Sequence, residues 1–320
     1  MAVTRRNILS DANVRAQFGK AVNQLKQESS GRTTADFGVA GAAVDVSTYD
    51  LFVIWHYQTM MTLTPAGNSA GRNAAHRGSI FLPWHRVMLM LFESNLQRVL
   101  GDDTFGLPYW DWAKDGDSTA AKQKKSKVWA VDCMGGSGSP VKNGPFRFVA
   151  ADPASFRVRI EADAFGRLRP VNRGLQRAFA TSGIGTLPTS QSVKDALQLS
   201  PYDEAQWDAD SDGFRNRVEG WSGGPDGEPW MHNRVHVWVG GDMGPGTSPN
   251  DPVFFMNHCN VDRIWESWMK KNGRIYKPTM TAPADLAGQR IDDPIASPDS
   301  TTTPRAVLDV SSVYVYDALP

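Results

Sequence analysis

The sequence predicts a mainly α-helical protein with extensive loops and a few short strands. Four segments that carry histidines combine helical spacing of apolar residues with helix start or stop signals. The region between them, roughly Lys114–Gly227, contains a lysine run, a glycine–serine loop and scattered prolines, so we expect loops and short helices there. Near the end, the alternating sequence VSSVYVY predicts a closing strand.

Composition excludes several classes of partner. Lys plus Arg and Asp plus Glu both number 34, so the formal net charge is zero and no basic field attracts nucleic acid or anionic lipid. No apolar stretch approaches the length of a membrane span and no apolar segment follows the N-terminal arginines, so we expect a cytoplasmic protein without membrane contact. Export together with an accessory protein is compatible with the sequence. Cys133 and Cys259 are too few for a disulfide scaffold and are typical of a reducing compartment, although one bridge is compatible with them.

The first two helical segments are Ser47–Met61 and the stretch that follows Phe81. Ser47–Met61 begins with residues suited to capping, runs without Pro or Gly, and carries His56 among large apolar residues. In the second stretch Pro83 suits the first helical position and Gly101 suits a stop. One face of this second helix is expected to comprise His85, Leu89, Phe92 and Leu96.

The other two helical segments carry the remaining histidines. We expect a short helix around Met231–Trp238, because glycines flank it on both sides. A longer helix is expected over Asn257–Lys271, where His258, Asp262 and Trp265 fall on one stripe.

The six histidines of the chain fall into two groups of three. The first group is His56, His76 and His85, and the second is His232, His236 and His258. His232 and His236 are four residues apart, an offset of about 40° on a helix, so both rings can reach one metal ion. His76 and His85 are nine residues apart, about two and a half helical turns, so one of them must lie in a loop.

Three imidazoles per site and few other ligands favour copper. Imidazole suits zinc, copper, iron and nickel, whereas thiolates would favour zinc and carboxylates magnesium or calcium. The sequence has neither an HExxH pattern nor a CxxC pair, which argues against a zinc protease or a structural zinc site. Two all-imidazole sites close together can bind one small molecule between them, and for copper that molecule is dioxygen.

At these residues the sequence resembles the tyrosinase family of dinuclear copper proteins, which includes catechol oxidases, o-aminophenol oxidases and haemocyanins. His76–Glu93 (HRGSIFLPWHRVMLMLFE) resembles the first-copper signature of the family, and LPYWDW from Leu107 its continuation. The stretch His232–His258, followed by CNVDRIW, resembles the second-copper signature. The resemblance covers most of residues 1–112 and 215–320, but not the central loops.

The resemblance implies a four-helix bundle that holds two copper ions, one on each histidine group. It implies the use of dioxygen to oxidise a phenolic substrate to a quinone or a quinone imine. We accordingly expect one catalytic domain over residues 1–320 without a C-terminal lid domain. A copper-delivering accessory protein is a further partner that some bacterial relatives have.

Three further residues receive roles through the resemblance. Glu219 and Asn233 correspond to a pair that holds a water molecule for deprotonation of the incoming phenol; Glu228 lies nearer in sequence but in a Gly- and Pro-rich loop. Many family members have a histidine where this chain has Asn257, a position expected to touch the substrate. This change favours o-diphenols or o-aminophenols over hydroxylation of monophenols.

We expect structural roles for several other residues. Asp262 is expected either to orient an imidazole or to pair with Arg263. The motif Tyr314–Tyr316 resembles the tyrosine motif of plant and fungal members, with Arg5 or Arg6 as its partner. The loop Met243–Ser248 is expected to border the substrate pocket, and Ala74 replaces the cysteine that forms a thioether in fungal and plant members. Large aromatics expected in the core are Trp84, Trp110, Trp112, Trp265 and Trp268.

Two other functions fit a histidine-rich dinuclear site. A reversible dioxygen carrier would shield its copper pair with extra domains, for which this chain offers no obvious segment. A dinuclear hydrolase with another metal would need bridging carboxylates, which the sequence does not arrange as ligands. The sequence therefore favours the oxidase, and it does not rank tyrosine, catechol, an o-aminophenol or a peptide as the substrate.

Overall fold

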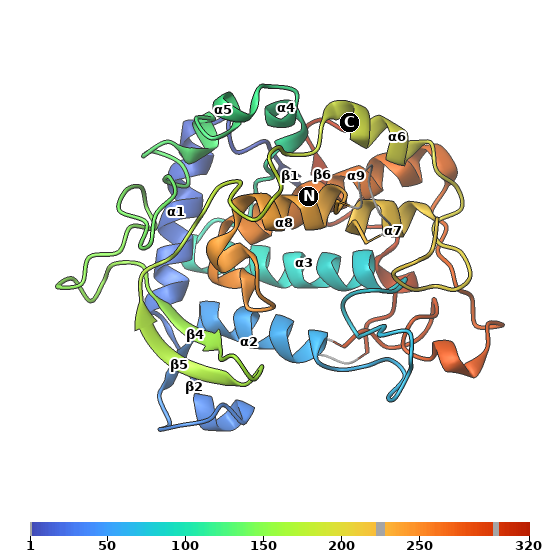
Figure 1. Cartoon of the computed structure of the whole chain (residues 1–320), viewed down its shortest axis with the longest axis horizontal. Helices are drawn as coiled ribbons and strands as arrows, with labels where there is room; N and C mark the ends of the chain where they lie inside the picture. Colours follow the sequence, from blue (N-terminus) through green and yellow to red (C-terminus); the bar gives the residue numbers. More distant parts are fainter. Residues whose placement is uncertain (1, 222–227, 297–300) are drawn as a thin grey trace.

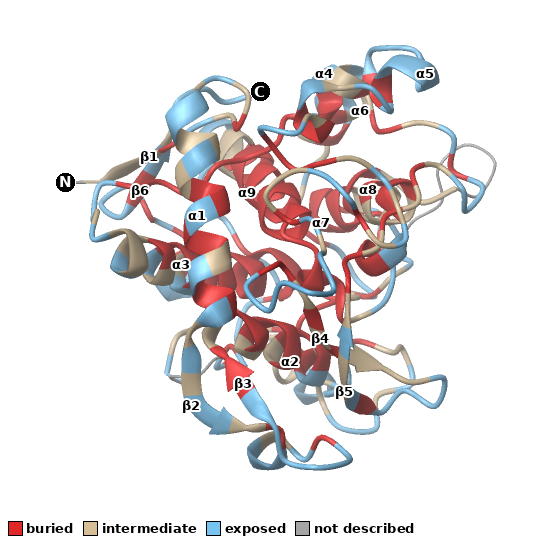
Figure 2. Ribbon diagram, turned by 90° about the vertical axis from the view of Figure 1, so that its left-hand side faces the viewer, coloured by how far each residue is buried: buried red, intermediate tan, exposed pale blue. Residues whose placement is uncertain are grey.

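Four helices that each carry at least one histidine form the centre of the computed structural model. They are α2 (Thr48–Met60), α3 (Phe81–Leu100), α8 (Met231–Val239) and α9 (Val253–Asn272). The structure describes residues 2–221, 228–296 and 301–320. In Figure 1, α2, α3 and α8 lie across the middle of the molecule, and Figure 2 shows that the buried residues concentrate on these helices and on α9. The expected mainly helical fold with a central bundle is confirmed. The last six residues of the expected central loop region, 222–227, lie outside the described residues.

Shorter helices and three small sheets surround this bundle. The remaining helices are α1 (Ala12–Gln27), α4 (Trp112–Gly116), α5 (Ala120–Gln123), α6 (Ser190–Leu197) and α7 (Phe214–Glu219). The strands are β1 (Val3–Arg5), β2 (Ser29–Thr33), β3 (Asp45–Ser47), β4 (Val158–Ala162), β5 (Leu168–Arg173) and β6 (Tyr314–Tyr316). They pair as β1 with β6 in parallel, and as β2 with β3 and β4 with β5 in antiparallel fashion.

The ends of the first two central helices follow from local chemistry. Ser47 caps α2, because its side chain accepts a hydrogen bond from the backbone N–H of Asp50. Gly101 ends α3 in the left-handed conformation (φ 65°) that glycine adopts without strain. Pro83 is the third residue of α3 rather than the first; it still lies in the first turn, where a backbone N–H has no intrahelical partner.

Two elements differ from the sequence-based expectation. Helix α9 begins at Val253, four residues before the predicted start, and the carboxylate of Asp251 accepts the otherwise unpaired N–H of this first helical residue (3.0 Å). Asn257 therefore lies inside the helix. The β4–β5 hairpin forms in the region expected to hold loops and short helices, and it buries Val158 and Ile160 on one face.

Helix α1 lies outside the predicted elements. Its N-cap Asp11 accepts hydrogen bonds from the N–H groups of Asn13 and Val14, and its buried face packs against α2 and α3 (Figure 2). That face comprises Phe18, Ala21, Val22 and Leu25, which have the spacing of one helical stripe. Among the described residues, none of the helices has the length and apolar character needed to cross a bilayer.

Asp262 closes a buried charge cluster rather than contacting an imidazole or Arg263. One oxygen of its carboxylate accepts from Arg86 Nε (2.6 Å), and the other accepts from the hydroxyls of Tyr314 and Tyr316 (both 2.6 Å) and from Arg5 Nη1 (3.4 Å). Both expected roles of Asp262 are therefore wrong, because its carboxylate oxygens already bind Arg86 and residues from the two ends of the chain. The expected strand at Tyr314–Tyr316 and its partnership with Arg5 are confirmed.

The Arg263 side chain interacts with Asn260 and Asp111 instead of Asp262. Its Nη1 atom donates to Asn260 Oδ1 (3.0 Å) and lies 3.5 Å from a carboxylate oxygen of Asp111. The five expected core tryptophans Trp84, Trp110, Trp112, Trp265 and Trp268 are all fully buried, as expected.

Removing the charge of Asp262 tests the importance of this cluster. Asp262→Asn removes the carboxylate that the buried guanidinium groups of Arg5 and Arg86 share, while Arg5 keeps Glu93 and Arg86 keeps Glu266. We therefore expect a loss of about 3 kcal/mol in the free energy of unfolding, the lower end of the range for a broken buried pair. Urea titration of the metal-free protein measures this change. Asp292→Asn, which removes an exposed partner of Arg305, is the control and should leave the unfolding midpoint nearly unchanged. Equal stability of the two variants would contradict the prediction.

Candidate metal centre

The first histidine triad joins two helices and a loop. His56 lies on α2, His85 on α3, and His76 in the loop between these helices, as the nine-residue spacing required. Their ring centroids are 4.8–5.8 Å apart. One nitrogen from each ring lies within 4.8 Å of those of the other two, so the three rings can share one metal ion.

The second triad has two members on one helix face. His232 and His236 lie one turn apart on α8 with ring centroids separated by 4.4 Å, which confirms the prediction from their spacing. His258 on α9 completes the group: its Nε2 lies 3.1 Å from His232 Nε2 and 3.4 Å from His236 Nε2. This triad also meets the distance condition for one metal ion.

The two triads lie next to each other. The rings of His85 and His258 stack with centroids 4.1 Å apart, and the rings of His76 and His232 are 6.1 Å apart. Such proximity is what a small molecule bridging two metal ions requires. Residues far apart in the sequence therefore converge on one centre, as the two groups of three predicted.

Backbone oxygens orient most of the rings. His56 Nδ1 donates to Gly246 O (2.7 Å), His85 Nδ1 to Phe81 O (2.8 Å), and His236 Nδ1 to Met243 O (2.7 Å). His232 Nδ1 lies 3.2 Å from Glu219 O and 3.0 Å from Asn233 Oδ1. A proton held on Nδ1 leaves the lone pair on Nε2, the nitrogen that points into the centre.

These carbonyl contacts were missed by sequence reasoning. Gly246 and Met243 belong to the loop after α8, and their role depends on where that loop lies rather than on their side chains. The only sequence signal for these contacts was that the loop follows the His232–His236 pair on α8.

Burial keeps the imidazoles neutral. Desolvation lowers the pKa of His56 to about 3 and that of His236 to about 4, and it lowers the pKa values of the other four as well. Phe81 and Phe254 each pack against rings of both triads and so help to exclude water. Neutral rings have a free lone pair, which is the form that binds metal.

The donor set fits metal ions that prefer imidazole. The buried Nε2 atoms of His56 and His85 have no hydrogen-bond partner within the described parts of the chain. An unpaired buried nitrogen is costly, and a bound metal ion removes this cost. Both free cysteines, Cys133 and Cys259, lie outside the two triads, so within the described residues neither thiolate nor carboxylate joins them.

A cavity of about 420 Å³ opens onto both triads. It is lined by His56, Met60, His76, Gly220, Trp221, Pro229, His232, Asn233, His236, Val237, Gly244, Pro245, Gly246 and Ser248. The expectation that the loop Met243–Ser248 borders the pocket is confirmed. Met60, Trp221, Pro229 and Val237 are additional lining residues that sequence reasoning did not identify.

The three residues with expected catalytic roles occupy different positions. Asn233 lines the cavity, whereas Glu219 is fully buried at the end of α7. The Asn233 side chain and the Glu219 backbone carbonyl both lie beside the Nδ1 atom of His232. Burial raises the pKa of Glu219 although Arg215 lies beside it. Asn257 is fully buried on α9 and does not belong to the cavity lining, and its expected contact with the substrate stays a prediction. Glu228, set aside on sequence grounds, pairs with Arg234.

Two adjacent histidine triads, with only His236 half-buried and the other rings buried, lie at the centre of a helical bundle and define a protein with a dinuclear metal site. Comparison with known proteins gives its family. The family model described as "Common central domain of tyrosinase" matches residues 46–271. Tyrosinase from Streptomyces antibioticus is 37% identical over 276 residues, which cover 84% of this chain and 89% of the relative. Tyrosinase from Streptomyces glaucescens is 36% identical over 324 residues, with 99% of each chain covered.

The fold agrees with the sequence match. The structure of a polyphenol oxidase variant from Thermothelomyces thermophila superimposes with a TM-score of 0.66 at 22% identity, covering 100% of this chain and 89% of the other. The chain belongs to the tyrosinase family. The cofactor of this family is a pair of copper ions, and the two triads offer one three-imidazole site for each ion.

Removing one ring tests the two-site arrangement. In His236→Ala the second triad loses one ligand while the first stays intact, so we expect the copper content after loading to fall from two ions per chain to one. Metal analysis of the desalted protein measures this ratio. Cys133→Ala removes a thiol outside both triads and should retain two copper ions. Two tightly bound ions in the His236→Ala variant would exclude this ring as a ligand.

Proposed function

We propose that this protein is a copper oxidase that uses dioxygen to oxidise o-diphenols or o-aminophenols to o-quinones or quinone imines. His56, His76 and His85 hold one copper ion, and His232, His236 and His258 hold the other. The observation that carries the proposal is that both triads face one cavity, so a ring bound there lies beside both metal positions. When bound, the copper pair supplies the binding and reduction of dioxygen.

The residues of the chain prepare the substrate for this chemistry. Gly244, Pro245 and Gly246 give the cavity an apolar surface, and the α8 residues Asn233 and Val237 belong to the same lining. A planar aromatic ring fits against such surfaces with its hydroxyl toward the histidines. Packing of Phe81 and Phe254 against the imidazoles keeps bulk water from the metal positions.

Glu219 and Asn233 supply the proton acceptor in this proposal. The Asn233 side chain and the backbone carbonyl of Glu219 both contact the ring of His232, and Asn233 also lines the cavity. The Glu219 carboxylate accepts hydrogen bonds from Arg77 N, Trp221 Nε1 and Arg215 Nη1, which leaves acceptor capacity for one further donor such as a water molecule. A water held between Glu219 and Asn233 would take the phenolic proton.

Substrate comparison tests the proposed reaction. With copper restored, we expect catechol and o-aminophenol to be oxidised under air and a monophenol to react more slowly, and initial rates and oxygen uptake measure this. Reversible oxygen binding without turnover of catechol would instead indicate a carrier. A monophenol rate equal to the catechol rate in the unmodified protein would contradict the expected preference.

The role of Asn257 in this preference stays a prediction: Asn257→His should raise the monophenol rate relative to the catechol rate.

The cavity also predicts a preference for uncharged substrates. None of the described residues that line it is Asp, Glu, Lys or Arg, so a charged substituent would lose hydration without gaining a counter-charge. We expect kcat/KM for 4-methylcatechol to exceed those for dopamine and 3,4-dihydroxyphenylacetate by about tenfold or more. Val237→Asp should shift the preference toward dopamine, because it places a carboxylate in the lining. Equal values for all three catechols would contradict this prediction.

Two further expectations belong to the proposal. We keep the cytoplasmic location and the copper-delivering accessory protein as predictions. Fractionation of cells that express the protein tests the first, and the copper content of protein produced without other chains from its source tests the second.

A further inference from the structure

His76 differs from the other ligands of the first triad in how it is held. His56 and His85 lie on helices and their Nδ1 atoms donate to carbonyl oxygens, whereas His76 lies in a loop. Its buried Nδ1 has no hydrogen-bond partner within the described residues. The position of this ring therefore depends on its packing against neighbouring rings such as Phe81 and on the backbone around it.

The backbone on both sides of His76 is firmly held. On the N-terminal side, Asn73 Oδ1 accepts from the N–H groups of Ala75 (3.0 Å) and His76 (2.7 Å). On the C-terminal side, Arg77 has a φ of 59°, a left-handed conformation that residues with a Cβ atom adopt at a cost. Something in the surrounding structure must stabilise this conformation.

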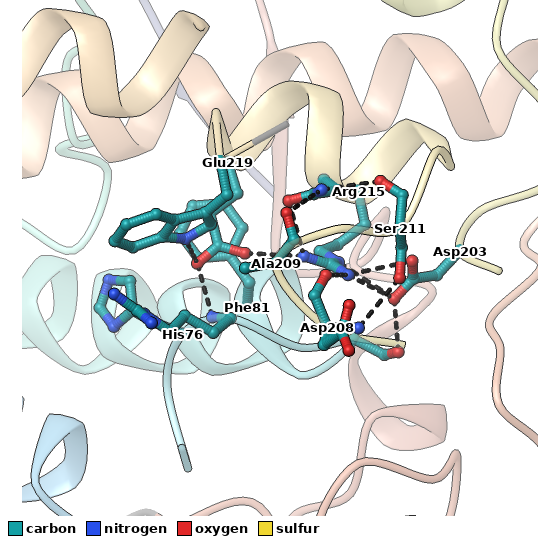
Figure 3. A network of polar contacts seen from close by, with 12 residues as sticks. His76, Phe81, Asp203, Asp208, Ala209, Ser211, Arg215 and Glu219 are labelled. Atoms are coloured by element: carbon teal, nitrogen blue, oxygen red, sulfur yellow. Dashed lines mark hydrogen bonds and ion pairs between the residues drawn. The ribbon is translucent and has the colours of Figure 1, made fainter. Parts of the chain in front are cut away.

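The Glu219 carboxylate provides that stabilisation. Its Oε1 accepts from Arg77 N (2.7 Å) and from Trp221 Nε1 (2.8 Å), and the Arg77 guanidinium lies 4.3 Å above the Trp221 ring. Figure 3 shows Glu219 reaching across from α7 to the loop that carries His76. The same residue also contacts the second triad, because its backbone carbonyl lies 3.2 Å from His232 Nδ1.

A buried ion cluster fixes Glu219 in turn. Arg215, one helical turn earlier on α7, donates from Nη1 to Glu219 Oε2 and from Nε and Nη2 to Asp203, each at 3.0 Å. Ser79 Oγ, in the segment just before α3, donates to Asp203 (2.6 Å). The side chains of Arg215, Asp203 and Glu219 are completely buried. Their polar groups therefore bind one another rather than bulk water, which fixes their positions (Figure 3).

We propose that Glu219, held by Arg215 and Asp203, is a positioning residue that fixes His76 through the Arg77 backbone and thereby retains copper at the first triad. This inference rests on the proposed function, and it is separate from the role of Glu219 as a proton acceptor. A residue that acts only on the substrate proton would leave metal binding unchanged. The positioning network controls metal binding itself.

Glu219→Gln is the sharpest test because it preserves size. Three N–H donors point at the carboxylate, and an amide with one acceptor oxygen leaves at least one of them facing its NH₂ group. We expect one of the two copper ions to dissociate into excess chelator about 10–100-fold faster than in the unmodified protein. The second ion should stay, because the Glu219 carbonyl that contacts His232 is unchanged.

Arg215→Met and Arg177→Met form a matched pair. Both arginines are completely buried and bind an aspartate through two nitrogens, but Arg177 pairs with Asp251 and contacts neither histidine triad directly. We expect Arg215→Met to lose one copper ion rapidly and Arg177→Met to keep both. Circular dichroism of each variant verifies that it is folded.

A second substitution at Arg77 keeps the proposal falsifiable if Arg215→Met does not fold. Glycine adopts the left-handed conformation at no steric cost, so Glu219→Gln combined with Arg77→Gly should recover most of the copper retention. The catalytic rate should not recover, because the proton acceptor is still absent. Two copper ions held by Glu219→Gln as firmly as by the unmodified protein would overturn the positioning role. Failure of the unmodified protein to bind two copper ions would instead overturn the proposed function.

Discussion

The structure depends on bringing six neutral imidazoles, five of them buried and His236 half-buried, to one centre with a lone pair of each available to a metal ion. Burial alone is unfavourable for such nitrogens, since water can no longer bond to them. The fold limits this cost by giving four of the rings an oxygen partner at Nδ1 and by placing one nitrogen of every ring where a metal ion can bind. The Nδ1 atoms of His76 and His258 have no such partner among the described residues. The bundle helices, the loop after α8 and the aromatic rings between the triads all serve this arrangement.

Buried ion clusters hold the helices that carry the ligands. On one side of the centre, Asp262 on α9 joins Arg86 on α3 to the two terminal strands. On the other, Arg215 and Glu219 on α7 connect to the loop of His76. Each carboxylate is bound by donors from separate elements, so a helix cannot shift without leaving a buried charge unpaired. The rigid ligand geometry thus originates in polar contacts outside the metal centre.

Much of the centre was predictable because its determinants are local. The four-residue spacing of His232 and His236 fixes their common helix face, and the nine-residue spacing before His85 requires a loop for His76. The partners of Asp262 and the carbonyl contact between Gly246 and His56 join segments up to 257 residues apart in sequence, which no local pattern specifies. Helix α1 and the β4–β5 hairpin had recognisable patterns, but neither carries a histidine, the residue on which the prediction of the other helices depended.

The parallel pairing of β1 with β6 has a consequence for biosynthesis. The partner of Val3–Arg5, Tyr314–Tyr316, is translated about three hundred residues later. Until then the guanidinium of Arg5 lacks its tyrosine neighbours, and α3 and α9 are not joined through the chain termini. The contacts of Asp262 with Tyr314 and Tyr316, which link α9 to these strands, can therefore form only after Tyr314–Tyr316 has been made.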